Sequence, residues 1–152
     1  MIALDAKAHV IGPSGERTVP FSEYFIGPRT DVLRENVLQH NELLMDVQVP
    51  PPVAGSKGSY HKVTNRGVYD FAIVNIATWL KLNNGVVDDA RIVLSGVAPT
   101  PHRSTAAEQV VKGKRIDAAL AKQAADQALL RARPMSENAY KVDVAKTLIQ
   151  RS

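Results

Sequence analysis

The sequence predicts an α+β fold in which a three-stranded antiparallel sheet packs against a three-helix bundle. Strand-like alternation of apolar residues is confined to the part before residue 99, and a helical period begins only after residue 104. Strands followed by helices, instead of strands alternating with helices, favour an antiparallel sheet with the helices on one face. With 152 residues of which 45% are hydrophobic, the chain is long enough to bury such a core.

The first fifty residues predict only short elements, none large enough to fold alone. In chain order they are a strand before residue 12, a turn at 13–15, a strand at 17–19, a helical turn at 22–25 and a strand at 44–49. In the last of these, Leu44, Asp46 and Gln48 alternate with apolar residues before three prolines end the strand. The following stretch "PPPVAGSKG" is stiff and then flexible, which makes it the predicted domain boundary.

The stretch "YHKVTNRGVYDFAIVNIATWLKL", residues 60–82, changes character at Asp70 from polar and basic to apolar. Residues 59–63 predict a strand, and residues 71–82 predict a second strand that is buried on both faces or nearly so. The "NNG" at 83–85 is a hairpin signal, and residues 90–98 supply its partner strand. Together they make the three-stranded sheet.

Three helices follow the sheet. Thr105 and Glu108 fit a capping box for a helix at 106–112, which Gly113 ends. A second, Ala-rich helix is predicted for residues 117–131, and a third begins after Ser136 with its apolar residues on one face.

Composition excludes several kinds of chemistry. Without cysteine there is no disulfide, thiolate metal site or iron–sulfur ligation, and the four histidines lack metal-site spacing. The glycines do not form a phosphate-binding motif. The net charge of +4 is scattered and aromatic residues make up only 5%, so no nucleic-acid partner is expected. No apolar run is long enough for a membrane helix and the N-terminus lacks a secretory signal pattern, so we expect a cytoplasmic protein without membrane contact.

Five segments in order resemble the last half of the FAD-binding medium subunit of the molybdenum hydroxylase family. They are "ERTVPFSEYFIGP", "ELLMDVQVPPP", "YHKVTNRGVYDFAIVNIA", "LSGVAPTPHRSTAAE" and "SENAYKVDVAKTLIQR". The family includes xanthine dehydrogenases, carbon monoxide dehydrogenase and aldehyde oxidoreductases. The resemblance implies that residues 1–52 are the end of the FAD-binding domain and that residues 53–152 are the flavoprotein C-terminal domain. It also implies that the half gripping the FAD pyrophosphate is not within this chain.

The resemblance further implies three flavin-site residues. Leu44 matches a leucine that packs near the isoalloxazine ring, and Lys62 matches a lysine beside it, whose charge would stabilise the reduced flavin. Asp70 ends a loop that lies near the flavin, and its carboxylate could pin this loop by capping backbone N–H groups or by pairing with Arg66. Each has an ordinary alternative: Leu44 as a core strand residue, Lys62 as an edge-strand lysine and Asp70 as a turn residue.

The resulting hypothesis is an FAD-subunit portion of a molybdenum-containing dehydrogenase, an oxidoreductase component expected to be inactive as this chain alone. FAD would receive electrons from iron–sulfur clusters and a molybdenum cofactor on partner subunits and pass them to an external acceptor. No residue of this chain is expected to be catalytic or to bind metal. Export with a partner would make the location periplasmic. The alternative hypothesis is a non-catalytic docking module that binds a partner protein or an anionic polymer through its basic helices.

Overall fold

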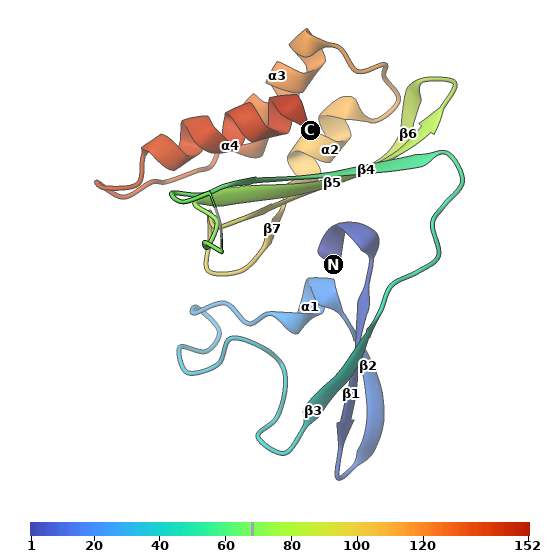
Figure 1. Cartoon of the computed structure of the whole chain (residues 1–152), viewed down its shortest axis with the longest axis vertical. Helices are drawn as coiled ribbons and strands as arrows, with labels where there is room; N and C mark the ends of the chain where they lie inside the picture. The colour runs from blue at the N-terminus through green and yellow to red at the C-terminus, as the bar shows by residue number, and fades with distance from the viewer. Residues whose placement is uncertain (68) are drawn as a thin grey trace.

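The computed structural model describes residues 1–67 and 69–152 and has an α+β fold with two antiparallel sheets. A small N-terminal unit with a three-stranded sheet lies below a larger domain, in which a four-stranded sheet carries helices on its far side (Figure 1). The stretch from Val49 to Gly55 runs between the two sheets.

The N-terminal unit is built from short elements, as predicted. These are the 3₁₀ turn η1 (Ile2–Leu4), β1 (Lys7–Gly12), β2 (Gly15–Pro20), α1 (Phe21–Tyr24) and β3 (Leu43–Gln48), with strand order β2-β1-β3. Its core is small: Ala8 and Val10 of the central strand are fully buried and pack with Phe21 and Tyr24 of α1. The edge strand β3 is exposed along its whole length.

The larger sheet has four strands, so the prediction of three was wrong. Its strands are β4 (Ser56–Val63), β5 (Val74–Asn83), β6 (Val86–Ser95) and β7 (His102–Arg103), in the order β4-β5-β6-β7. The additional strand β7 is only two residues long and pairs with Val93 and Leu94 of β6. Two residues among prolines show no periodicity, which is why the sequence pattern did not reveal this strand.

The boundaries of β5 also differ from the prediction. The strand begins at Val74 instead of residue 71, and Phe71 is 95% exposed. The hairpin at 83–85 is confirmed: Asn84 and Gly85 both have positive φ, as such a tight turn requires. Because that turn closes early, β6 begins at Val86, four residues before the predicted start.

The three helices are α2 (Thr105–Val111), α3 (Ala118–Ala128) and α4 (Tyr140–Arg151). The capping box was wrong. Ser104 is the N-cap of α2, because its hydroxyl accepts from the amide of Ala107, while Glu108 turns back to the sheet and accepts from the amide of Ile92. The stop of α2 at Gly113, in a left-handed conformation, and the start of α3 after its N-cap Asp117 follow the prediction, but α3 ends at Ala128, three residues before the predicted end.

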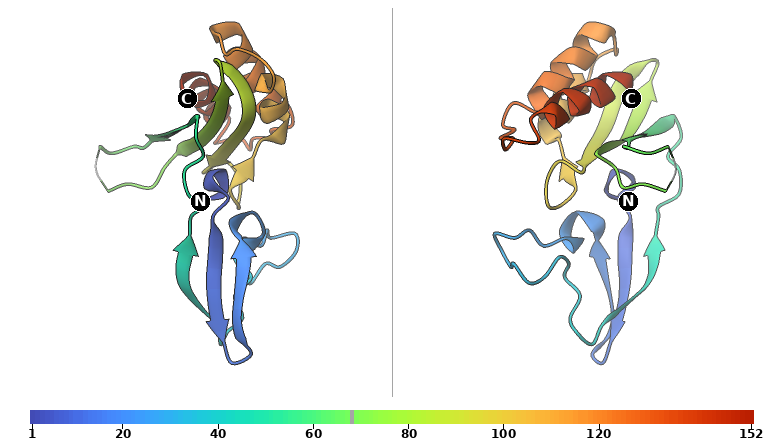
Figure 2. Two further views of the ribbon diagram at one scale, coloured as in Figure 1. Left: turned by 90° about the vertical axis from the view of Figure 1, so that its right-hand side faces the viewer. Right: turned by 60° about the vertical axis from the view of Figure 1, so that its left-hand side comes forward.

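Strand β5 is covered on both faces, which explains its nearly continuous apolar sequence. Its even-numbered residues, such as Ile76, lie on the face that packs against the three helices. Its odd-numbered residues face the other way, where Trp79 packs with Val93 of β6 and with Ala3 of the N-terminal unit. Figure 1 and the right-hand view of Figure 2 show the helices on one side of this sheet. The prediction of a strand buried on both faces is therefore confirmed from residue 74 onward.

Candidate functional site

Lys62 lies on the sheet face that points away from the helices. It is opposite Asn75 of β5, and its neighbour Tyr60 is opposite Ala77, which belongs to the same face as Trp79. Because strand side chains alternate, Ser59 of the same strand points the other way and bonds to the hydroxyl of Thr78. The exposed ammonium group of Lys62 is therefore on the side of the sheet that carries the N-terminal unit.

Lys62 and Asp70 meet at the base of the loop that joins β4 to β5. The ammonium nitrogen of Lys62 donates a hydrogen bond of 3.1 Å to the main-chain carbonyl oxygen of Asp70. A lysine has three donors, so besides this bond the ammonium group keeps protons that can point outward.

The carboxylate of Asp70 holds the loop together. It accepts from the amides of Arg66 and Phe71, each at 3.0 Å, and from the Arg66 guanidinium at 3.3 Å. The guanidinium and amide of Arg66 lower the pKa of the Asp70 carboxyl below its ordinary value, and the Phe71 amide adds to this. Both contacts expected for Asp70, with backbone N–H groups and with Arg66, are present.

Two aromatic side chains beside Asp70 are uncovered. Tyr69 has a positive φ of 48° and is fully exposed, and Phe71 is 95% exposed. The left-handed conformation is costly for a bulky residue, so it persists only where surrounding contacts enforce it. Sequence reasoning placed Phe71 inside the strand and missed its exposure, because its apolar character continues the strand pattern.

The end of the loop is fixed by Val63 at the end of β4 and by Gly96, the residue that follows β6. The amide of Ile73 donates to the carbonyl of Val63 at 2.8 Å. Gly96 lies against this segment with a φ of 75°, and a Cβ at this position would be 2.7 Å from the Ile73 carbonyl oxygen. The Gly96 carbonyl in turn accepts from Lys141 of α4 at 3.0 Å. The end of the loop therefore has a defined position beside the large sheet, and the Gly96 contact connects this position to α4.

Leu44 is on β3 of the other sheet. A β-bulge in this strand changes the face of the sheet on which the Leu44 side chain lies. His9 pairs with Asp46 but Val10 pairs with Leu44, so Met45 is an extra residue in β3. The bulge places Leu44 on the face of the buried Val10, whereas the simple alternation in the sequence had grouped it with Asp46. Leu44 remains 39% exposed.

The structure thus brings two of the three predicted residues together. Lys62 and Asp70 are in contact, while Leu44 belongs to the separate three-stranded sheet. In both views of Figure 2, β3 and the loop after β4 are on the same side of the molecule.

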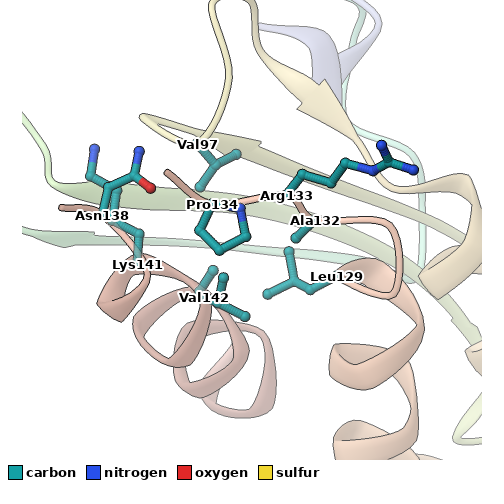
Figure 3. A pocket seen from close by; sticks show the side chains of 9 residues that line it. Val97, Leu129, Ala132, Arg133, Pro134, Asn138, Lys141 and Val142 are labelled. Carbon is teal, nitrogen blue, oxygen red and sulfur yellow. The ribbon is translucent and has the colours of Figure 1, made fainter. Parts of the chain in front are cut away.

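A pocket of about 110 Å³ lies between the end of α3 and the beginning of α4 (Figure 3). Leu129 and Val142 form apolar walls, and Asn138 and Lys141 lie at its edge. It includes none of the three predicted site residues. Within the described residues there is also no cluster of three acidic, histidine or cysteine side chains suited to a metal ion.

Two family models cover almost the whole chain. Residues 59–152 match the CO dehydrogenase flavoprotein C-terminal domain, and residues 1–52 match the FAD binding domain in molybdopterin dehydrogenase. The fold and these matches define a flavoprotein component. The chain belongs to the FAD-binding medium subunits of the molybdenum hydroxylase family, with their C-terminal domain and part of their FAD-binding domain.

Individual relatives agree with this family. The carbon monoxide dehydrogenase medium chain of Hydrogenophaga pseudoflava is 29% identical over 99% of this chain and 52% of its own length. The aldehyde oxidoreductase FAD-binding subunit PaoB of Escherichia coli (strain K12) is 32% identical over 96% of this chain and 43% of its own. The chain therefore spans about half the length of the curated relatives it matches.

Solved structures share the fold. In the carbon monoxide dehydrogenase from Hydrogenophaga pseudoflava that lacks the Mo-pyranopterin moiety, one chain superposes with a TM-score of 0.88 at 31% identity. In quinoline 2-oxidoreductase from Pseudomonas putida 86 the TM-score is 0.86 at 26% identity. Each match covers 99% of this chain and 52% of the other.

Proposed function

We propose that this chain forms one wall of the flavin site in the FAD subunit of a molybdenum-containing dehydrogenase. Residues 1–52 are then the end of the FAD-binding domain and residues 53–152 the C-terminal domain. Leu44, Lys62 and Asp70 line the site, with Asp70 acting through the shape of the loop. The observation that carries this proposal is the Lys62 ammonium group, held on an open face by the Asp70 carbonyl.

The residues around Lys62 fit a planar, electron-accepting ring. An exposed cation suits the negative charge that a flavin gains on reduction. The uncovered side chains of Tyr69 and Phe71 offer aromatic surface next to it, on which a planar ring would pack. The internal hydrogen bonds of Asp70 keep this surface in place before anything binds.

Strand β3 supports the idea that the site needs more chain than these residues. All six of its residues are exposed, including Leu43 at 68% and Met45 at 57%. An apolar edge strand open on both faces is normally covered by other chain. We propose that the remainder of the FAD-binding domain, as found in full-length relatives, packs here and holds most of the FAD.

The flavin would supply electron transfer between iron–sulfur clusters and an external acceptor. The substrate would be oxidised at a molybdenum cofactor on another subunit, so no residue of this chain acts as an acid, base or nucleophile. The partners are then an iron–sulfur subunit and a molybdenum-cofactor subunit. Within the described residues no helix is long and apolar enough to cross a membrane. A cytoplasmic location is part of the proposal.

The test is a chimaera in which this chain replaces the matching half of the Hydrogenophaga pseudoflava medium chain. The expected product is yellow and has a flavin absorption spectrum. Denaturation should release one FAD per chimaeric chain. Lys62→Ala should lower the flavin potential by roughly 30 mV, equivalent to about 1.4 kcal/mol for a two-electron couple.

The matched control is Lys57→Ala, which removes the same charge from the same strand. Lys57 pairs with Leu80, so its side chain leaves β4 on the opposite face, and its removal should leave the potential unchanged. The unmodified Hydrogenophaga pseudoflava chain, purified in parallel, shows that the procedure retains FAD. A folded chimaera without flavin would contradict the proposal and favour the docking-module alternative.

A further inference from the structure

Arg91 joins the two parts of the chain through two contacts made at once, while it stacks on Trp79 within the large sheet. It lies on β6 opposite Trp79 of β5, and its guanidinium carbon is 4.1 Å from the centre of the indole ring. One terminal nitrogen is 2.6 Å from the carboxylate of Asp5, and the other donates to the carbonyl oxygen of Ala3 at 3.3 Å. Its side chain is only 16% exposed.

The geometry depends on properties that only arginine has. A guanidinium group can stack on an aromatic ring with its face while its edge donates to several acceptors, whereas a lysine ammonium is a point charge. Asp5 is presented by the left-handed turn that ends η1, with a φ of 50° and its amide bonded to the Ile2 carbonyl. The Arg91 side chain of the large sheet therefore contacts both a backbone carbonyl and a carboxylate of the η1 turn in the N-terminal unit.

The other contacts between the two parts are limited. A small apolar cluster joins Ala3 to Trp79 and Val93, and Arg91 lies at its edge. The connecting stretch contains three prolines, which stiffen it, and then Gly55 with a φ of 77°. Gly55 itself is held against the large sheet, because its carbonyl accepts from the Leu82 amide at 3.0 Å. The connector therefore limits the distance between the sheets, and the angle between them depends on the torsions of residues 49–54 and on contacts such as those of Arg91.

We propose that Arg91 is a positioning residue that fixes the angle between the N-terminal unit and the large sheet. It thereby sets how β3, with Leu44, faces the loop of Lys62 and Asp70. The importance of this angle for flavin rests on the proposed function. The angle itself is measurable without flavin.

The chain contains no cysteine, which permits a direct distance measurement. Ser14→Cys on the β1–β2 turn and Gln123→Cys on α3 place one spin label on each part, both at exposed positions. Pulsed electron paramagnetic resonance should give one narrow distance distribution for this double-labelled chain. Arg91→Met, which keeps an apolar stem over Trp79, should at least double the width of the distribution, and Arg91→Lys should give an intermediate width.

Arg29→Met is the control, because it removes the same charge from an exposed position in the N-terminal unit. It should leave the distribution narrow. An Arg91→Met distribution as narrow as that of the control overturns the proposal. If Arg91→Met does not fold, Asp5→Asn decides. Asparagine tolerates the left-handed backbone and removes only the charge, so its distribution should be broader than that of the control.

The consequence for flavin is measured in the chimaera. Arg91→Lys should raise the apparent Kd for FAD roughly tenfold if only about a tenth of the molecules keep the angle between the two sheets that binds FAD. An unchanged Kd contradicts a role of the angle in flavin binding. If the chimaera that retains Arg91 is already flavin-free, the proposed function is contradicted instead. The distance measurement then still tests whether Arg91 fixes the angle between the N-terminal unit and the large sheet.

Discussion

The Lys62 side chain spans the loop after β4 and donates to the carbonyl oxygen of Asp70, eight residues further along the chain, at 3.1 Å. The two residues depend on each other. The Asp70 carboxylate organises the backbone of the loop, and that backbone provides the acceptor that orients the Lys62 charge.

Asp70→Asn tests this organisation. An amide oxygen can replace only part of what the carboxylate does, because the Arg66 guanidinium loses its charged partner. We expect exchange of the Arg66 and Phe71 amide protons to become roughly tenfold faster, while the strands of the large sheet keep their protection. Hydrogen exchange followed by NMR measures this, and unchanged exchange at both amides would show that the carboxylate does not hold the loop.

Gly96→Ala should destabilise the protein by about 2–4 kcal/mol. About 1 kcal/mol comes from the left-handed backbone, and the rest from a Cβ placed 2.7 Å from the Ile73 carbonyl oxygen. Gly113→Ala is the matched control, because Gly113 has nearly the same φ of 76° but no atom within 4 Å of the added Cβ. Urea unfolding should show a loss of only about 1 kcal/mol there. Equal losses at the two positions would remove the steric argument.

Glu108→Ala should cost about 2–4 kcal/mol of unfolding free energy. Glu108 is 7% exposed and accepts from the amide of Ile92 at 3.0 Å and from Arg103 at 2.8 and 3.1 Å. Removing it leaves a buried amide without an acceptor and a partly buried guanidinium without a counter-charge. Glu137→Ala, at an exposed position before α4, should change stability by less than about 0.5 kcal/mol.

Glu42 should make the N-terminal unit sensitive to acid. Hydrogen bonds from Arg17 and from the Gln39 amide lower the pKa of Glu42 from 4.5 to about 2. Because the unfolded chain binds this proton first, the stabilisation is present above pH 4.5 and is lost as the pH falls towards 2. Glu42→Gln should flatten the pH dependence of the urea midpoint in this range, and an unchanged slope would show that Glu42 is not its cause.

His9 should respond to pH in the opposite direction. The ring lies between Asp46 at 2.8 Å and Glu16 at 3.0 Å, and hydrogen bonds to these two carboxylates raise the pKa of His9 above 6.5. Its stabilising effect is therefore complete below pH 6.5 and is lost as the pH rises through the folded pKa. NMR titration should show a midpoint above 6.5, which Asp46→Asn lowers more than Glu16→Gln. A midpoint that neither variant moves would contradict this account.

Much of the fold follows from local sequence patterns. The alternation in β5 and the helical period after residue 104 reflect burial on fixed faces, and both survive in the structure. What the patterns miss depends on pairing between strands. The bulge that turns Leu44 arises from the register between β1 and β3, and β7 exists only because two residues reach the edge of β6.

The candidate site was less accessible to sequence reasoning than the fold. Residue spacing alone gave no sign that Lys62 contacts Asp70, because the contact depends on how the intervening loop turns; both residues were selected through family resemblance. Arg91 was missed altogether. Its partners Asp5 and Ala3 are more than eighty residues away, so no local pattern connects them.

The bare outer edge of β3 has a practical consequence for anyone who handles this polypeptide. Its backbone N–H and C=O groups are free to pair with a strand from another molecule, and the flanking leucine, methionine and valine side chains would favour that pairing. The strand's single charge, on Asp46, is already engaged by His9 and gives little repulsion. Self-association should therefore limit the concentration at which the isolated chain stays monodisperse, and a lysine in place of Met45 should raise that limit.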